Sequence, residues 1–370
     1  MLFRSTPPSG FNALNTQNLP TPTIGNGANY MAATPYLGNG STNAISNAVN
    51  SISFKPDLVW LKNRVSGYSS GLYDSVRGAG NTKGLYSNET SAEGTNSAYQ
   101  NLVSFDSSGF TLGSTSSTNA INELNYSNIG WQWKAGAGSS SSNTSGSITS
   151  TVSVNATAGF SIATFSTTAV SSQTWGHGLG VAPKMVIVKS RGGADNWYVY
   201  HVSLGNGNQI QLNSTSASAA TNLWNSTTPT STIVTFGAGF ASVANYVAYC
   251  FADVAGYSAF GSYSSNASSD GPFVFTGFRP RWVMIKKASG TTNTNTGWYI
   301  YDTARSTYNV IGAYLLANSS SAENSFSAID ILSNGFKIRV TDISVNTSTA
   351  GDTYIYAAFA ENPFKLSLAR

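Results

Sequence analysis

The sequence predicts an all-β protein of three tandem β-sandwich modules, jelly-roll-like in kind, with an extended N-terminal arm. Three observations support this fold class. One ordered set of strand and turn motifs occurs three times along the 370 residues, and a repeat of fixed order dictates the architecture. Ser, Thr, Asn and Gly replace most charged residues, and these residues favour turns over helix interiors. Helix signals are few.

Each copy of the repeat contains the same elements in the same order. An apolar strand begins at a proline and ends in a lysine, and a Tyr-rich strand, a Leu/Asn/Ser/Thr turn, a Gly-Phe pair and an aromatic closing strand follow. The prolines are Pro56, Pro183 and Pro280, and the lysines are Lys62, Lys189 and Lys286. Short apolar strands between Gly/Asn/Ser turns are typical of β-sandwiches. Three propeller blades are a weaker alternative, because a unit of roughly 100 residues is twice the size of a blade.

Residues 1–30 are predicted to form the arm. Prolines at positions 7, 8, 20 and 22 interrupt any helix or central strand. Phe11, Leu14 and Leu19 are apolar enough to anchor the arm on a neighbouring subunit or module. The alternative is a frayed terminus.

The three predicted modules span residues 31–137, 138–256 and 257–370. In the first proline strand, Leu58 and Trp60 alternate with Val59 and Leu61, so both faces of the strand are predicted to be covered. The Gly/Ser-rich stretch 136–143 is a linker by composition. It sets the end of the first module.

Composition limits the function classes. Only 9% of residues are charged, against about 25% in an average soluble protein, while 41% are hydrophobic, which excludes general disorder. A net charge of +4 without a Lys/Arg run gives no footprint for nucleic acid. No apolar stretch reaches the roughly 18 residues that membrane insertion requires. Cys250, the only cysteine, is expected to be a buried, inert thiol.

No set of residues indicates catalysis. His177 lies in a glycine loop that lacks the strand-to-helix context of a phosphate loop. His201 occupies the position that Asp74 and Asp302 hold in the other copies, which predicts a hydrogen-bonding role. A triad, a dinucleotide motif and metal-ligand spacing are all missing from the sequence. We therefore expect no catalytic residue, no metal and no cofactor.

Two carboxylate positions recur in the first and third copies only. Asp74 and Asp302 each precede an arginine by three residues, and Glu93 and Glu323 follow the polar turn. The second copy has His201, Leu204 and Ser218 at the corresponding positions. These four acids are candidates for a polar or ion site, for sugar or calcium, which places a ligand on the outer modules. The alternative is a structural ion pair that fixes the turn to the sheet. The three lysines are interpreted as edge-strand or snorkelling side chains.

Aromatic residues divide into two groups. Those within strand patterns are predicted to be core, namely Trp60, Trp131, Trp133, Trp197, Trp282 and Trp298. Those in loop-like polar stretches are candidates for ligand binding, namely Trp175, Trp224, Tyr68, Tyr99 and Tyr308. Exposed aromatic rings stack on sugars and also anchor protein interfaces.

The longer motifs resemble a known module. It is common in tail-fibre-like and other virion structural proteins of marine bacteriophages, often behind a SPRY-type, lectin-like domain. The stretches that carry the resemblance are Phe54–Arg64, Gly71–Gly78, Ser87–Glu93, Ser104–Leu112, Gly277–Lys286, Trp298–Arg305, Ser333–Arg339 and Tyr354–Phe364. Gly10–Ile24 is similar to the segment that joins such modules to the lectin-like domain.

The resemblance implies a non-enzymatic virion protein that is assembled in the host cytoplasm. A tail fibre or fibre-like adhesion component would contact the host surface, with surface polysaccharide as its ligand. The arm would contact other virion proteins, and a homo-oligomer is expected, a trimer by default. One alternative is a capsid decoration or head-fibre protein without a receptor role. Another is a glycan-degrading tailspike, for which only the Asp74/Glu93 and Asp302/Glu323 positions could supply the acids.

Overall fold

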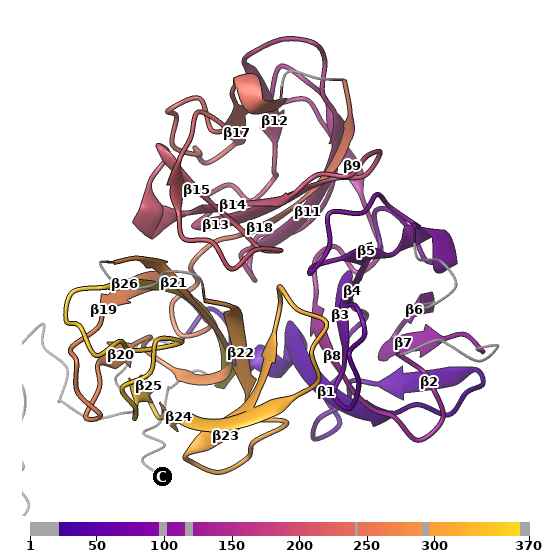
Figure 1. Cartoon of the computed structure of the whole chain (residues 1–370). Helices are drawn as coiled ribbons and strands as arrows, with labels where there is room; N and C mark the ends of the chain where they lie inside the picture. The colour runs from indigo at the N-terminus through magenta and orange to yellow at the C-terminus, as the bar shows by residue number, and fades with distance from the viewer. Residues whose placement is uncertain (1–21, 96–101, 115–120, 241–242, 291–295, 363–370) are drawn as a thin grey trace, which may run out of the picture.

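The computed structural model describes residues 22–95, 102–114, 121–240, 243–290 and 296–362. Strands dominate this part of the chain, and its helices are 3-10 turns of three residues each. The all-β fold class is confirmed. The strands form three lobes around a common centre (Figure 1), and no strand of one lobe joins a sheet of another in the described part.

Lobe 1 contains two sheets. The larger has the strand order β1-β8-β3-β4-β5, and the smaller has the order β2-β7-β6. Their bounds are β1 (Met31–Leu37), β2 (Asn43–Ser46), β3 (Leu58–Asn63), β4 (Gly71–Asp74), β5 (Leu85–Tyr86), β6 (Leu102–Asp106), β7 (Gly109–Leu112) and β8 (Ser127–Trp133).

Lobe 2 repeats this plan with additional strands. Its large sheet has the order β16-β15-β14-β13-β18-β11-β10-β9, and β12 pairs with β17 in a second sheet. The bounds are β9 (Ser141–Asn143), β10 (Ser150–Asn155), β11 (Phe160–Ser166), β12 (Gln173–Gly176), β13 (Met185–Ser190), β14 (Trp197–His201), β15 (Asn208–Gln211), β16 (Ala219–Ala220), β17 (Ile233–Phe236) and β18 (Asn245–Phe251).

Lobe 3 forms one continuous sheet in the order β19-β26-β21-β22-β23-β24-β25-β20. The bounds are β19 (Ser258–Ser264), β20 (Phe273–Phe275), β21 (Arg279–Ser289), β22 (Trp298–Asp302), β23 (Ile311–Leu316), β24 (Asn324–Leu332), β25 (Gly335–Ile338) and β26 (Thr353–Asn362).

The register makes the inner strands of the three copies equivalent residue by residue. The inner strand order β1-β8-β3-β4-β5 recurs as β11-β18-β13-β14-β15 and as β19-β26-β21-β22-β23. In each copy the proline strand pairs with the Tyr-rich strand in the same way, through Leu58↔Asp74, Met185↔His201 and Trp282↔Asp302. His201 therefore stands where the two aspartates stand, as the sequence predicts.

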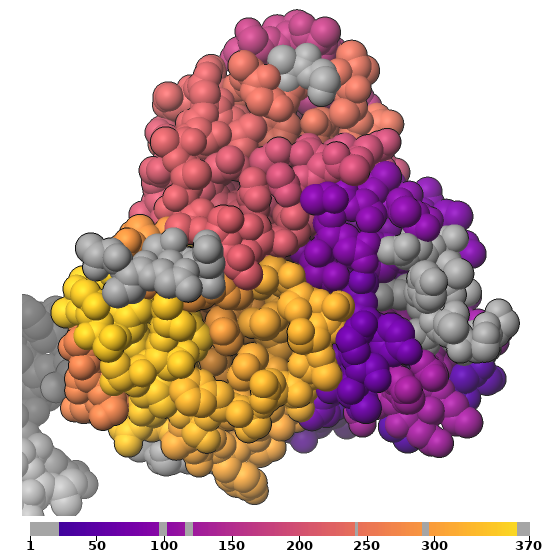
Figure 2. Space-filling model, viewed as in Figure 1, coloured from indigo at the N-terminus to yellow at the C-terminus, as the bar shows by residue number. Residues whose placement is uncertain are grey.

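The proline strands of lobes 1 and 2 separate two cores, whereas both faces of the lobe 3 strand belong to one core. In lobe 1, Leu58 and Trp60 belong to an apolar cluster that all three lobes share, whereas Val59 and Leu61 belong to the core inside the lobe. The prediction that both faces of this strand are covered is confirmed. The shared core surrounds the centre of the molecule and encloses an apolar cavity of about 20 Å³, and the lobes meet closely in the space-filling view (Figure 2). The rings that line this cavity are Trp60, Trp133, Tyr249, Phe251, Phe260, Trp282 and Phe359.

Two of the Gly-Phe pairs recur because a neighbouring strand passes close to the glycine. A Cβ atom at Gly109 would lie 1.9 Å from the Ile45 carbonyl oxygen on β2, and one at Gly335 would lie 2.0 Å from the Val274 oxygen on β20. No larger residue can stand there without moving the strand. The phenylalanine that follows each glycine is fully buried.

The N-terminal arm falls mostly outside the described residues. Within its described part, Ile24 is buried in the shared core. The Tyr30 ring contacts the Tyr257 ring edge-on at 6.0 Å, next to lobe 3. This part of the chain is therefore packed against the centre.

Candidate functional site

The polar residues that the repeat shares meet at the junctions between lobes. Lys62, Lys189 and Lys286 are fully buried, so the interpretation as edge-strand or snorkelling lysines is wrong. Each lies on an inner strand of its sheet with hydrogen-bonded neighbours on both sides. Each ammonium group instead donates to a carbonyl oxygen in the polar turn of a neighbouring lobe. The contacts are Lys62 Nζ to Ser319 O at 2.6 Å, Lys189 Nζ to Thr90 O at 3.1 Å, and Lys286 Nζ to Thr215 O at 2.7 Å.

These three contacts have one cyclic sense. Lobe 1 donates to lobe 3, lobe 2 donates to lobe 1, and lobe 3 donates to lobe 2. Burial lowers the pKa of Lys62 to about 7, with a further lowering from the charge of Arg305. Burial also lowers the pKa of Lys286 to about 7 and that of Lys189 to about 8. Removing a cation from water disfavours its charged form.

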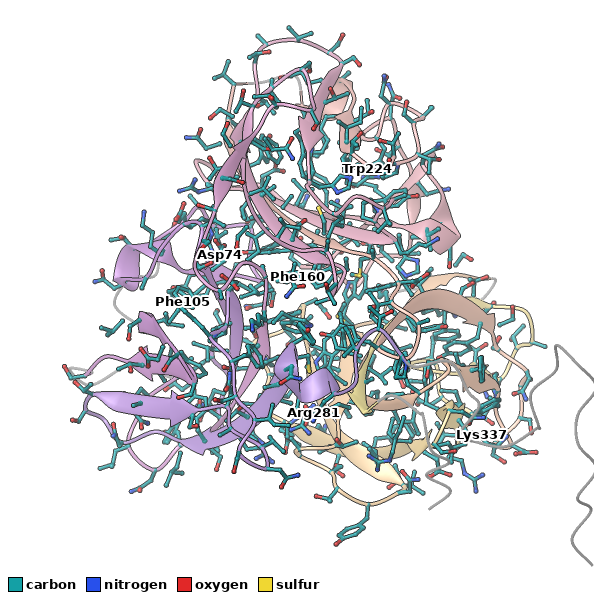
Figure 3. The ribbon with its side chains drawn as sticks, turned by 180° about the vertical axis from the view of Figure 1, so that it is seen from behind. Asp74, Phe105, Phe160, Trp224, Arg281 and Lys337 are labelled. Carbon is teal, nitrogen blue, oxygen red and sulfur yellow. The ribbon has the colours of Figure 1, made fainter. Side chains whose placement is uncertain are left out.

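The first carboxylate pair joins lobe 1 to lobe 2. Asp74 forms an ion pair with Arg77, and its carboxylate also accepts the Tyr249 hydroxyl of lobe 2 at 2.9 Å. Glu93 Oε2 lies 2.5 Å from Arg191 Nε of lobe 2. Figure 3 shows Asp74 where lobe 1 meets lobe 2. Both acids are thus bound by cations and donors of the protein.

The second pair joins lobe 3 to lobe 1 in the same way. Asp302 lies 2.6 Å from Arg305 Nε and accepts the Trp131 indole N–H of lobe 1 at 3.0 Å. Glu323 accepts from Arg64 of lobe 1 through both carboxylate oxygens, at 2.9 and 2.7 Å. Such a bidentate pair fixes both the distance and the angle between the two groups.

The junction between lobes 2 and 3 uses neutral groups at the equivalent positions. His201 Nδ1 accepts the Ser203 N–H, so Nε2 donates to the backbone carbonyl oxygen of Tyr356 in lobe 3 at 3.1 Å. Burial lowers the pKa of His201 to about 4, which keeps the ring neutral at pH 7. Ser218 donates its N–H and its hydroxyl to the Ala288 oxygen of lobe 3, at 2.8 and 2.9 Å.

The arginines Arg64 and Arg191 were missed by the sequence reasoning, although a signal exists. Each stands two residues after a repeat lysine, and the third copy has Ala288 there. The second copy has Ser218 in place of the acid, and the third copy has Ala288 in place of the arginine. Ser218 and Ala288 contact each other across the junction between lobes 2 and 3. The loss of the acid from one copy and of the arginine from the next could have shown that acid and arginine contact each other between neighbouring lobes.

The aromatic residues predicted to bind a ligand differ in their exposure to solvent. The expectation that Trp175 and Trp224 lie exposed in loops is wrong, because both are fully buried. Trp175 stacks on Phe165 at 4.6 Å within lobe 2. Trp224 donates its indole N–H to Asn208 O at 3.1 Å and lies inside lobe 2 in Figure 3.

The tyrosine candidates lie nearer the surface. Tyr308 is 86% exposed, and the half-buried Tyr68 contacts the Tyr126 ring at 6.4 Å. Tyr99 lies outside the described residues. Ligand binding by these residues, and ion binding by Asp74, Glu93, Asp302 and Glu323, stay predictions.

The second histidine and the cysteine are both buried. His177 Nδ1 accepts the Leu179 N–H at 3.2 Å, and Nε2 lies 3.1 Å from Thr230 O, which is a structural role. Cys250 is fully buried, and burial raises the pKa of its thiol. Among the described residues, no group of three or more His, Cys, Asp and Glu side chains could hold a metal ion. No helix in the described ranges is long and apolar enough to span a membrane.

Comparison with known proteins gives one family. Residues 26–363 match a family described as a domain of unknown function, DUF7483, so the match extends across all three lobes. No curated protein and no solved structure matches the chain. The chain is a member of the DUF7483 family.

Proposed function

We propose that this protein is a non-enzymatic structural component of a bacteriophage particle, most specifically a tail fibre or fibre-like component that contacts the host surface. One observation carries the structural part. The ionisable residues that the repeat shares form contacts between lobes, as in the ion pairs Glu93–Arg191 and Glu323–Arg64. The assignment to a phage particle comes from the resemblance of the repeat motifs.

We also propose that the lobes are three tandem β-sandwich modules whose large sheets face a common centre. The repeated strand order supports this reading. A chain of this kind builds within itself the three-way packing that a trimeric fibre would obtain from three subunits. A homo-oligomer, with a trimer as the default, and attachment through the arm stay part of the proposal.

The tailspike alternative would require a pair of carboxylates free to act on a glycan. Asp74 and Asp302 are instead paired with Arg77 and Arg305 and almost fully buried. This arrangement favours the structural function. Loss of polysaccharide viscosity on incubation with the purified protein would favour the tailspike.

Labelling of intact particles with an antibody against this chain tests the proposal. We expect label on the tail in electron micrographs, and failure of particles lacking the protein to adsorb to host cells. Label on the head lattice, with normal adsorption of the deficient particles, would indicate a decoration or head-fibre protein. Absence of the chain from purified particles would overturn the virion assignment.

A further inference from the structure

Lobe 2 has an open polar groove at a place where, in lobe 1, two tyrosine rings contact each other. The groove lies between the loop after β13, residues 190–195, and the start of β18, residues 243–246, and its volume is about 400 Å³. Pockets that take small ligands measure roughly 300–1,000 Å³. A single sugar ring therefore has enough space in this groove.

The groove exists because two aromatic side chains are replaced. Asn63↔Asn128 in lobe 1 and Ser190↔Tyr246 in lobe 2 hold the same place in the register of their sheets. The strands that follow the two loops, β4 and β14, also pair with β3 and β13 in the same register. Loops 64–69 and 191–196 consequently have the same length, and Asp195 corresponds to Tyr68. Ala244 corresponds to Tyr126 by the same register. In lobe 1 the two tyrosine rings contact each other at 6.4 Å across this space.

Two side chains at the groove each have one polar atom without a hydrogen bond to a described residue, an acceptor on Asp195 and a donor on Asn245. Asp195 Oδ1 accepts from Asn196 N–H and from the Tyr198 hydroxyl, both at 2.8 Å, while Oδ2 accepts no bond from a described residue. Asn245 Oδ1 accepts the Ser166 hydroxyl at 2.6 Å, and its amide nitrogen donates to no described residue.

The backbone and one apolar side chain complete the lining. The N–H groups of Gly192 and Gly193 form no hydrogen bond within the described ranges. Both residues have open space where a side chain would stand, so a ligand can approach the backbone. Val243 is 75% exposed at the opposite side, which gives an apolar surface for the C–H face of a ring.

We propose that this groove binds one neutral sugar unit of a glycan. Adjacent hydroxyls of a sugar both donate and accept, so one carboxylate oxygen, one amide nitrogen and backbone N–H groups complement them. An anion is disfavoured by Asp195. A divalent cation requires more oxygen ligands than one carboxylate site supplies. The inference deepens the proposed function by naming a ligand for a host-contacting protein, and it moves the expected ligand site from the outer modules to lobe 2.

The test uses the purified full chain and saturation-transfer NMR with free glucose, galactose, mannose and N-acetylglucosamine, each at millimolar concentration. We expect at least one sugar to bind. Asp195→Asn should weaken that binding about tenfold or more, because a charged acceptor is lost. Asp195→Tyr combined with Ala244→Tyr should abolish it, because this variant restores the side chains that occupy the space in lobe 1.

Asp270→Asn is the matched control, since Asp270 pairs with Lys337 on lobe 3 and does not line the groove. It should bind like the unmodified chain, and a thermal melt of each variant reports whether it is folded. Binding by none of the four sugars overturns the inference, and so does unchanged binding by the folded double-tyrosine variant. Because no particle is involved, either result is independent of where the protein lies in a virion.

Discussion

The indole N–H of Trp131 in lobe 1 donates to the carboxylate of Asp302 in lobe 3 at 3.0 Å, across 171 positions of the sequence. The Arg305 guanidinium, which is paired with the same carboxylate, lies over the Trp131 ring at 5.6 Å. This contact joins the first repeat to the last. Together with the Tyr249–Asp74 and His201–Tyr356 contacts, it closes a ring of three junctions.

Trp131→Phe should lower the free energy of unfolding by about 1–3 kcal/mol more than Trp175→Phe, measured by urea denaturation. Both indoles are fully buried, so both substitutions remove the same ring volume. Only Trp131 loses a hydrogen bond, because the Trp175 indole N–H has no partner among the described residues. Equal losses would mean that the Trp131–Asp302 bond contributes no stability.

The Glu93–Arg191 pair should show strong coupling in a double-mutant cycle. Glu93→Ser alone leaves Arg191 without its carboxylate and should destabilise the protein. Adding Arg191→Ala removes the unpaired cation and reproduces the Ser218–Ala288 combination that already joins lobes 2 and 3. The double variant should therefore be more stable than the sum of the single changes predicts, by about 0.5–3 kcal/mol.

Additive effects in this cycle would contradict the view that acid and arginine act as one unit. A second cycle with Glu323→Ser and Arg64→Ala should give coupling of the same sign, since those residues form the equivalent pair.

Stability should rise with pH between about pH 7 and pH 9, measured as the urea midpoint. The folded-state pKa of Lys62 and Lys286 is lowered to about 7, and that of Lys189 to about 8, whereas an unfolded lysine titrates near about 10.4. In this window the unfolded chain binds protons that the folded chain does not, so raising the pH favours folding. Groups whose pKa values burial raises act in the opposite direction: the single Cys250 thiol from about pH 8.5, where it offsets part of the effect of the three lysines, and the buried tyrosines from about pH 10.

Lys286→Met is the variant that assigns this effect. It removes one of the three depressed titrations and should make the pH dependence shallower. Lys337→Met is the matched control, because Lys337 lies at the surface of lobe 3 and pairs with the exposed Asp270. A slope that is unchanged by Lys286→Met would show that the junction lysine does not titrate in this range.

Much of the fold follows from local patterns in the sequence. Alternation along Leu58–Leu61 predicts a strand covered on both faces, and the common register of Asp74, His201 and Asp302 follows from the repeat. Neither the alternation nor the repeat predicts how one copy is placed relative to another. The burial of Lys62 follows from that arrangement, and a lysine that ends an apolar strand is more commonly found near solvent.

The candidate site is harder to predict, because the residues next to a side chain in the sequence do not show whether that side chain is buried. Trp175 and Trp224 stand among Ser, Thr, Asn and Gly, yet both rings fill the core of lobe 2. The lobe 2 groove depends on Asp195 and Ala244, which are 49 positions apart in the sequence. Their significance becomes visible only beside Tyr68 and Tyr126 in the equivalent place.

Differential scanning calorimetry of the full chain tests most directly whether the three lobes form one closed unit through their shared core and junctions. We predict a single transition in which the calorimetric and van't Hoff enthalpies agree, because no lobe can separate without exposing Trp133, Phe251 and Phe359. Two or three resolved transitions, each matching the unfolding of one lobe, would contradict this account.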